Sequence, residues 1–253
     1  MSGWFEDAVT RLMEVELFGL SGGPLAAVVF ISFCALLLIY AGVYRALRRR
    51  ELERLMPRLD FQPVDSPDPA QLVPEELFYP NGFTSQQLEA GYASLLPRIS
   101  QAWSGRIAGH RALVMDVSIT RTRGRRTSKS FDGTVIRCAP PGDAPPDFKI
   151  TEWVLFKGQI RGQRAIAGPA EMGQHYYLFS DAPDEALEPW VTPTLRSQLE
   201  RFRLWDIAVH GGVFFLAQGN ARLRPDDFPQ FLAEAESLLA GLTAAAGRDR
   251  QAL

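Results

Sequence analysis

The side chains best suited to proton transfer or metal binding in this chain are three histidines, His110, His175 and His210. They are far apart in the sequence. If folding brought them together, they could bind a metal ion with a carboxylate from Asp116 or Asp132. The alternative is that each histidine faces solvent or makes a local hydrogen bond, because each lies near the end of an expected strand. We favour this second interpretation.

The two aspartates offer a separate hypothesis, since Asp116 and Asp132 flank an expected hairpin and could form a carboxylate pair across it. The competing interpretation is that both are solvent-facing strand residues, one of them near Arg137. Motifs for phosphate binding, a serine nucleophile, zinc proteolysis or a redox dithiol are absent from the sequence. Cys34 and Cys138 are too few for a disulfide framework. We therefore predict no catalytic residue, cofactor or metal.

The densest group of charges lies in an expected turn. Five basic residues occur within nine positions: Arg121, Arg123, Arg125, Arg126 and Lys129. Such a tip attracts anionic lipid headgroups, by about 1 kcal/mol per basic residue near the surface. An acidic partner protein and a solvated tip without function are the alternatives. We expect no nucleic acid, because the chain from residue 45 onward has 26 basic and 25 acidic residues and lacks a broad positive field.

A long uncharged stretch near the N-terminus is the element expected to position the part of the chain that carries these residues. The 28 positions from Leu17 to Tyr44 contain no charged residue. As a helix, positions 24–44 rise by about 31 Å, close to the thickness of a bilayer's hydrocarbon core. A buried core helix is rarely this apolar, and a cleaved signal peptide begins with basic residues, whereas acidic residues dominate here. The sequence predicts one transmembrane helix.

Flanking charges predict its orientation. Only Arg11 precedes the stretch, whereas five arginines follow within ten residues. By the positive-inside rule the C-terminal domain is cytoplasmic and the N-terminus lies outside. We expect a single-pass protein of the bacterial inner membrane. The candidates for contact with the membrane or a partner on this side are Arg45, Arg48, Arg49 and Arg50.

We expect four segments. Residues 1–20 form an amphipathic helix, which either anchors at the membrane interface or contacts another membrane protein. Residues 21–56 are the transmembrane helix and basic stalk, and Gly22 and Ala26 provide a small-residue spacing that leaves a homo-oligomer open. Residues 57–83 are a Pro-rich acidic tether, although apolar residues such as Phe61 indicate that parts of it pack onto the domain. Residues 84–253 are the cytoplasmic domain.

The patterns in this last segment predict an α+β fold, a mostly antiparallel sheet packed by two or three helices. A helix is expected from Thr84 through about Ile99, with Pro97 ending or kinking it. Period-two alternation predicts strands at 106–108, 110–122 and 130–138, and further strands at 148–156, 162–166 and 175–179. A helix should open at Thr192, a hairpin should turn at residues 211–212, and a final helix should open at Pro225.

Composition is compatible with this arrangement. The chain has 253 residues, a net charge of −2, 22% charged residues and a mean hydropathy of −0.07, which excludes disordered, collagen-like and multi-span classes. Arginine outnumbers lysine 24 to 3. This bias is typical of GC-rich bacterial genomes and supports the bacterial location.

The order of these features resembles a family of uncharacterised bacterial membrane-tethered proteins, a domain of unknown function. The residues that carry the resemblance are FDGTVI at 131–136, YYLFSDAPD at 176–184, VHGGV at 209–213 and LRPDDF at 223–228. It spans roughly residues 95–240 and implies a membrane-tethered domain, but no activity, ligand or catalytic residue. Members often have two spans, whereas this chain has one.

Three functions follow from these observations. The first is a non-enzymatic interaction or accessory protein of the inner membrane, bound to the lipid bilayer and to a protein partner in or at it. The second is a lipid- or ligand-sensing domain that docks on anionic headgroups. The third is an enzyme of unrecognised type that uses the histidines or the two aspartates.

Overall fold

The computed structural model describes residues 22–65, 67, 94–123, 126–139, 144–152, 164–172, 175–219 and 221–243. The chain divides into two compact units, Met1–Leu52 and Glu53–Leu253. The amphipathic segment expected at 1–20, most of the expected tether and the first part of the helix expected from Thr84 lie outside the described residues.

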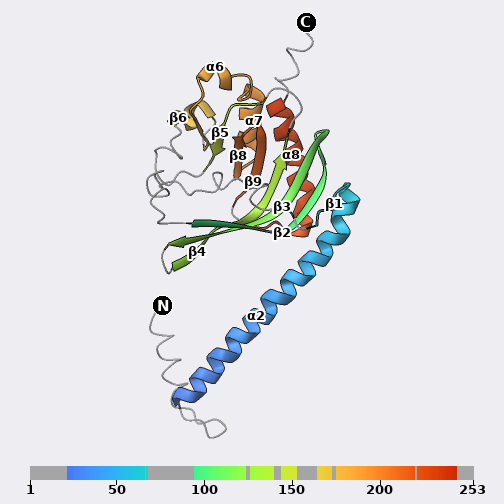
Figure 1. Ribbon diagram of the computed structural model, residues 1–253, viewed down its shortest axis with the longest axis vertical. Coiled ribbons are helices and arrows are strands. Elements are labelled where there is room, and N and C mark those ends of the chain that lie inside the picture. The colour runs from blue at the N-terminus through green and yellow to red at the C-terminus, as the bar shows by residue number, and fades with distance from the viewer. Residues whose placement is uncertain are drawn as a thin grey trace. The chain divides into compact units, whose positions relative to one another are not determined.

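The first unit contains most of α2 (Gly22–Leu55), a 34-residue helix drawn in blue in Figure 1. Its large apolar side chains between Val28 and Leu47 are largely exposed, and that of Leu38 is 75% exposed. A helix of this length rises about 51 Å. Among the described residues it is the one helix long and apolar enough to cross a membrane.

The described part of the second unit is built on a nine-stranded sheet in which every pair of neighbouring strands is antiparallel. The strand order is β1-β2-β3-β4-β9-β8-β5-β7-β6. The strands are β1 (Gln62–Pro63), β2 (Ser94–Ile107), β3 (His110–Arg123), β4 (Arg126–Cys138), β5 (Phe148–Thr151), β6 (Arg164–Ala167), β7 (Tyr177–Ser180), β8 (Trp205–His210) and β9 (Val213–Gln218). The predicted α+β class with an antiparallel sheet is confirmed.

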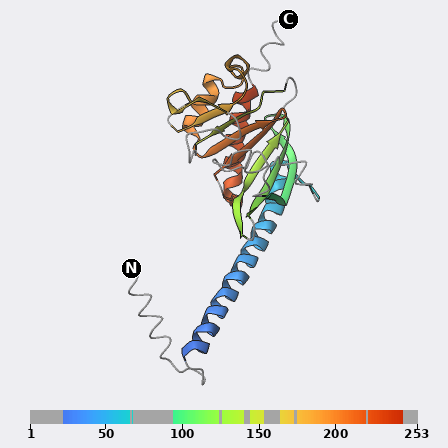
Figure 2. The same ribbon diagram turned by 60° about the vertical axis from the view of Figure 1, so that its left-hand side comes forward.

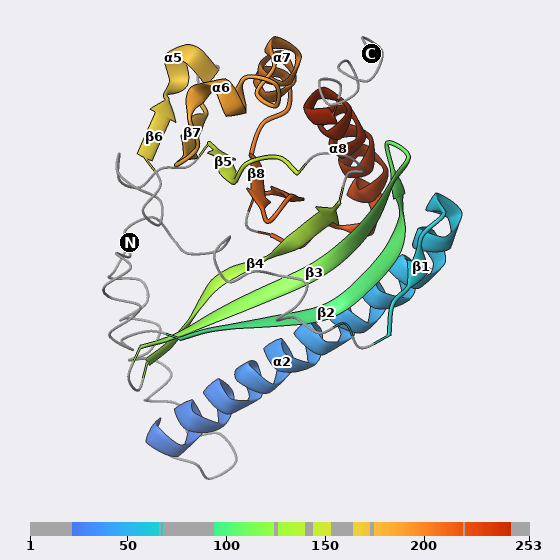
Figure 3. The same ribbon diagram turned by 45° about the horizontal axis from the view of Figure 1, so that its top comes forward.

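Four α-helices accompany the sheet in the described part of this unit: α5 (Pro169–Met172), α6 (Asp184–Leu187), α7 (Pro193–Arg201) and α8 (Phe228–Thr243). The 3-10 turns η1 (Met56–Leu59) and η3 (Pro225–Asp227) precede β1 and α8. As predicted, α7 opens at Thr192, whose hydroxyl accepts a hydrogen bond from the Leu195 N–H at 3.1 Å. Figure 3 shows the short helices α5 and α6 next to β6 and β7, the last two strands in the order of the sheet.

The longest of these helices, α8, packs on the sheet through aromatic side chains, and Figure 2 shows its course beside the strands. Trp205 of β8 stacks on Phe231 with ring centroids 5.0 Å apart, and Trp103 of β2 meets Phe228 edge-on at 6.4 Å. The indole N–H of Trp205 also donates a hydrogen bond to Glu234 at 2.9 Å. The predicted amphipathic final helix is therefore confirmed, with its first turn formed as η3.

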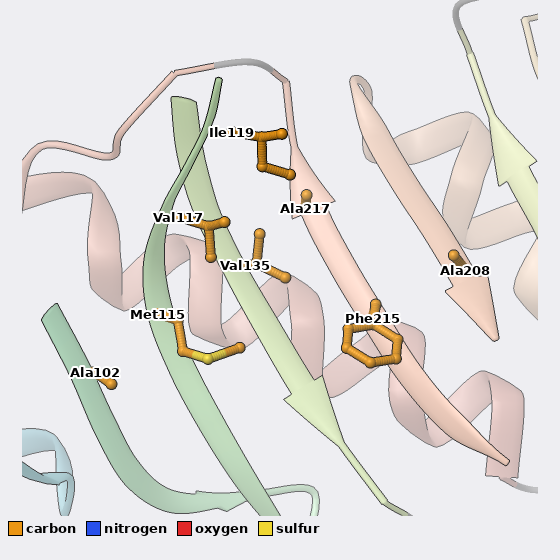
Figure 4. Packing of buried hydrophobic residues seen from close by; sticks show 8 residues of the cluster. All are labelled: Ala102, Met115, Val117, Ile119, Val135, Ala208, Phe215 and Ala217. Carbon is orange, nitrogen blue, oxygen red and sulfur yellow. The ribbon is translucent and has the colours of Figure 1, made fainter. Parts of the chain in front are cut away.

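The opposite face of the sheet carries a second buried cluster, shown in Figure 4. Because successive strand residues alternate between faces, Val114, which pairs with Trp103, lies on the α8 face and Met115 lies on the other. The cluster comprises Ala102, Met115, Val117, Ile119, Val135, Ala208, Phe215 and Ala217. Both faces of the central strands therefore carry buried apolar side chains.

One predicted element is wrong. The helix expected to reach Ile99 is replaced from Ser94 onward by β2, which pairs with β3 from Ser94 to Ile107. The apolar residues of this short run fit both a helical and a strand period, so pairing with a long neighbouring strand decides the outcome. Pro97 disfavours a helix but is compatible with this strand, because within the described residues β1, the outer neighbour of β2, pairs with it only at residues 103 and 104.

The first residues of the expected tether belong to the folded unit, and we call residues 56–64 the junction segment. Asp60, at φ 61°, ends η1, and the Phe61 N–H donates to the Met56 carbonyl at 2.9 Å. Phe61 is 2% exposed and its ring lies against Gly105, where a Cβ would come within 2.5 Å of the ring. The Val64 N–H then donates to the Ala102 carbonyl at 2.9 Å.

Candidate functional site

The basic turn predicted from the sequence joins β3 and β4. β3 ends at Arg123 and β4 begins at Arg126, whereas Arg125 and the side chains of residues 121–130 lie outside what the structure describes. β4 pairs with β9 only from Val135 to Cys138. The three strands β2, β3 and β4 therefore continue beyond β9, and we call this extension (residues 94–99, 117–123 and 126–134) the basic arm; Figure 1 shows it.

The register of the arm places several arginines on one face. Arg123 pairs with Arg126, and Arg121 pairs with Ser128 and with Leu95 of β2. Cross-strand partners share a face, and residues two apart on one strand do so as well. Arg121, Arg123 and Arg126 thus occupy one face at the end of the arm, which we call the arginine triad. A register shift after Ile119 places Lys129 opposite Thr120, on the other face.

The predicted stalk arginines all lie in α2. Arg45, Arg49 and Arg50 are exposed, and Arg48 is 7% exposed. They therefore lie within the first two helical turns beyond Tyr44, the last residue of the uncharged stretch. This is the region where basic residues flank a membrane-spanning helix.

The three histidines lie in different places. His210 ends β8, beyond the pair Val209–Phe148, whereas His175 precedes β7 at its opposite end, where Tyr177 pairs with Thr151. His110, at the start of β3, is separated from β8 by β4 and β9, or about 14 Å at the usual strand spacing. The Nδ1 atom of His210 lies 3.0 Å from the carboxylate of Asp147. The hypothesis of one shared histidine site is therefore not supported by the register.

The interpretation of both aspartates as solvent-facing residues is wrong for Asp116, whereas the side chain of Asp132 is 26% exposed. Asp116 is fully buried and accepts a hydrogen bond from the Thr134 hydroxyl at 2.8 Å. The same hydroxyl accepts the Leu223 N–H at 3.2 Å. Asp132 pairs with Ser118, a diagonal position from Asp116, and forms an ion pair with Arg222 at 2.8 Å. Both carboxylates lie on the α8 face, and their contacts attach the segment before α8 to the sheet.

A polar cluster that the sequence did not indicate lies where β5 meets β8. Asp206 of β8 accepts a hydrogen bond from Thr151, and the charge of Lys149 lies nearby. Burial is the largest influence on Asp206 and raises the pKa of its carboxyl above the ordinary value, although Lys149 and Thr151 act in the opposite direction.

Next to this cluster, the segment between α7 and β8 is held in an uncommon conformation. Leu204 has φ 67° and is 60% exposed. Glu152 accepts hydrogen bonds from the Leu204 N–H at 2.7 Å and from Arg203 at 2.6 Å. Burial acts to raise the pKa of Glu152, but these hydrogen bonds, with the charges of Arg203 and His175, outweigh it and lower that pKa.

The hydroxyl of Tyr176 also forms hydrogen bonds with the backbone of this segment. It donates to the Phe202 carbonyl at 2.8 Å and accepts the Trp205 N–H at 3.4 Å. Burial, the largest influence, raises the pKa of Tyr176 to about 12, so the phenol stays protonated. Sequence reasoning missed this arrangement because Glu152, Tyr176 and Asp206 are far apart along the chain.

Within the described ranges, no group of three or more His, Cys, Asp or Glu side chains could hold a metal ion. Comparison with protein-family models, with curated proteins and with solved structures finds no match for this chain. The resemblance to a family of membrane-tethered proteins therefore stays a prediction. The strongest candidate for a functional site is the end of the basic arm, because it combines a dense charge with a position beyond the last pairing of β4 with β9.

Proposed function

We propose that this chain is a single-pass protein of the bacterial inner membrane whose folded unit, Glu53–Leu253, is a non-enzymatic interaction or accessory module. The observation that carries the proposal is α2. Its apolar side chains from Val28 to Leu47 are exposed to a degree that water disfavours and a bilayer favours.

The charge distribution supports an orientation with this unit in the cytoplasm. The arginines at 45, 48, 49, 50 and 54 follow the apolar stretch directly, and only Arg11 precedes it. Basic residues close to the end of a span are retained on the cytoplasmic side.

The contacts of the acidic residues support an interaction role over catalysis. Asp116, Asp132, Glu152 and Glu234 each hydrogen-bond a residue from another element. Such bonds hold strands, helices and connecting segments together. An enzyme of unrecognised type would instead need a carboxyl group poised for a substrate, and Asp206 is the residue at which to test that alternative.

Two measurements test the proposal. After alkaline carbonate washing, the full chain should stay with the membrane pellet, and recovery in the supernatant would refute membrane anchoring. A reporter fused to the C-terminus that is active only outside the cytoplasm should be inactive, while a cytoplasmic fluorescent reporter should be bright. The reverse pattern would refute the orientation.

The interaction role needs its own test, because a membrane protein can be anchored without binding another protein. Chemical crosslinking in intact cells, followed by purification in mild detergent, should give a defined adduct larger than the monomer. Recovery of the chain alone from several detergents and crosslinkers would refute the interaction role while leaving the anchoring intact.

A further inference from the structure

The junction segment pairs with β2 near one end of that strand, whereas the end of the basic arm lies at the other end of it. Gln62 of the junction segment pairs with Ser104 of β2, whereas Ser94 of β2 pairs with Thr122 near the end of the arm. Ten strand residues between these two pairings correspond to about 33 Å. The chain therefore enters the folded unit at one end of β2, and the arm ends near the other.

The helical stalk that precedes the junction segment is shorter than this distance along β2. From Arg45, the first residue after the uncharged stretch, to Met56 the chain advances eleven residues, or about 17 Å of α-helix. The end of the arm lies about 33 Å along β2 from the pairing with the junction segment, which is longer than the stalk of about 17 Å. This distance is sufficient for the end of the arm to reach the surface from which the stalk emerges.

The arginine triad has the charge that such a surface would bind. Arg123 and Arg126 are direct cross-strand partners, and like charges at such positions repel each other. An anion placed against them removes this repulsion, and arginine is well suited to phosphate because of its planar array of donors. Arg121 lies two residues from Arg123 on the same face and adds a third positive charge.

We infer that the arginine triad of Arg121, Arg123 and Arg126 docks on the phosphate groups of anionic phospholipids in the bilayer that α2 spans. This inference rests on the proposed membrane anchoring. It favours lipid over other anions because the bilayer is already held within reach of the arm by the same chain. Docking is then an intramolecular step that requires only modest affinity.

The size of the effect follows from the number of charges. Each basic residue near an anionic surface contributes about 1 kcal/mol, which is about a fivefold change in the ratio of docked to undocked arms. Removing Arg123 and Arg126 should lower that ratio about 30-fold. Because salt shortens the Debye length from about 10 Å at 0.1 M to about 3 Å at 1 M, docking should also be lost at high ionic strength.

The chain provides a matched control for this double substitution. Arg106 and Arg111 are also direct cross-strand partners, on β2 and β3, and both are exposed. They lie at the other end of the same strands, beside the turn at Ala108 and Gly109. R106Q/R111Q therefore removes the same charge from a cross-strand pair of the same sheet, on β2 and β3, without touching the arm.

The test uses the full chain reconstituted in phosphatidylcholine vesicles with or without phosphatidylglycerol. A fluorophore attached to G124C in a C34A background reports contact with headgroup-attached nitroxide quenchers. Cys138 stays unlabelled, because it is fully buried and burial, partly offset by Arg137, raises the pKa of its thiol to about 11. Carbonate washing of the same samples confirms that each variant is membrane-anchored.

We expect the wild-type chain to show quenching only with phosphatidylglycerol and to lose it at high salt. Quenching should be lost in R123Q/R126Q. It should be retained in R106Q/R111Q and in R123K/R126K. Equal quenching in phosphatidylcholine alone, or equal loss in both glutamine variants, would overturn the inference. The inference would also be overturned if phosphatidylglycerol left the quenching unchanged and an RNA oligonucleotide bound to the chain in a way that required the arginine triad. A chain that fails the carbonate test contradicts the membrane anchoring itself, which separates the two failures.

Discussion

The junction segment offers a sharp test of how the folded unit begins. Replacing Phe61 by Ala removes a ring that is 2% exposed and lies against Gly105. Large-to-small substitutions of buried phenylalanine cost about 3–5 kcal/mol. We expect the lower end of this range, about 3 kcal/mol, because the segment lies at an edge of the sheet and can partly collapse into the space.

The same contact can be perturbed from the other side. A Cβ on Gly105 would lie 2.5 Å from the Phe61 ring, so Gly105→Ala must displace it; overpacking of this kind costs about 1–3 kcal/mol. In a Phe61→Ala background the space is empty, and the added methyl group should be neutral or stabilise by up to about 1 kcal/mol, the usual advantage of alanine over glycine. The two substitutions should therefore couple by about 2 kcal/mol.

The assay is guanidinium denaturation of the full chain at a fixed detergent concentration, followed by tryptophan fluorescence. Hydrogen exchange provides a local measurement, because the amides of Phe61 and Val64 donate to Met56 and Ala102 and should lose protection in Phe61→Ala. Effects of Phe61→Ala and Gly105→Ala that add to within about 0.5 kcal/mol would refute the packing argument.

Four further predictions concern other parts of the molecule. Because the folded-state pKa of Asp206 is raised, the fold loses stability as pH rises from the unfolded pKa, about 3.9, through the folded one. The free energy of unfolding of Asp206→Asn should therefore increase relative to that of the wild type over this pH range, which denaturation at several pH values measures. Leu204→Gly should stabilise by up to about 1 kcal/mol, because the left-handed backbone at φ 67° costs a leucine about 1–2 kcal/mol and little apolar surface is lost; a marked drop in Tm would contradict it. Trp205→Phe should cost about 1–2 kcal/mol in denaturation experiments, since it keeps the ring on α8 but removes the hydrogen bond to a carboxylate. Replacing Leu37 and Leu38 by Arg should release the chain from carbonate-washed membranes, at about 3 kcal/mol per residue, whereas the paired alanine variant should stay bound.

Much of the fold depended on local signals and could be predicted. The hairpin between β8 and β9 turns at Gly211 and Gly212, both with positive φ as a two-residue turn requires. Thr192 caps α7, and the spacing of the apolar residues in α8 correctly predicted which of its residues are buried. These features are local because a turn, a cap or an amphipathic face is specified by residues a few positions apart.

The helix expected through Ile99 failed for the complementary reason. Its apolar residues are compatible with more than one period, and the competing influence, pairing with β3, involves residues about twenty positions away. The same limitation applied to Asp116, which looked like an exposed strand residue until the segment before α8 was found to pack over it.

By itself, then, the sequence determined the apolar helix, the asymmetric charges around it, the antiparallel α+β class and the existence of a basic hairpin. Only the tertiary structure decided which residues share a face or a contact. It placed Arg121, Arg123 and Arg126 on one face of an arm beyond β9, separated the three histidines, and joined Asp206 to Thr151. The physical reason is that charge and periodicity are properties of neighbouring residues, whereas strand register is fixed by the burial of side chains that are distant in the sequence.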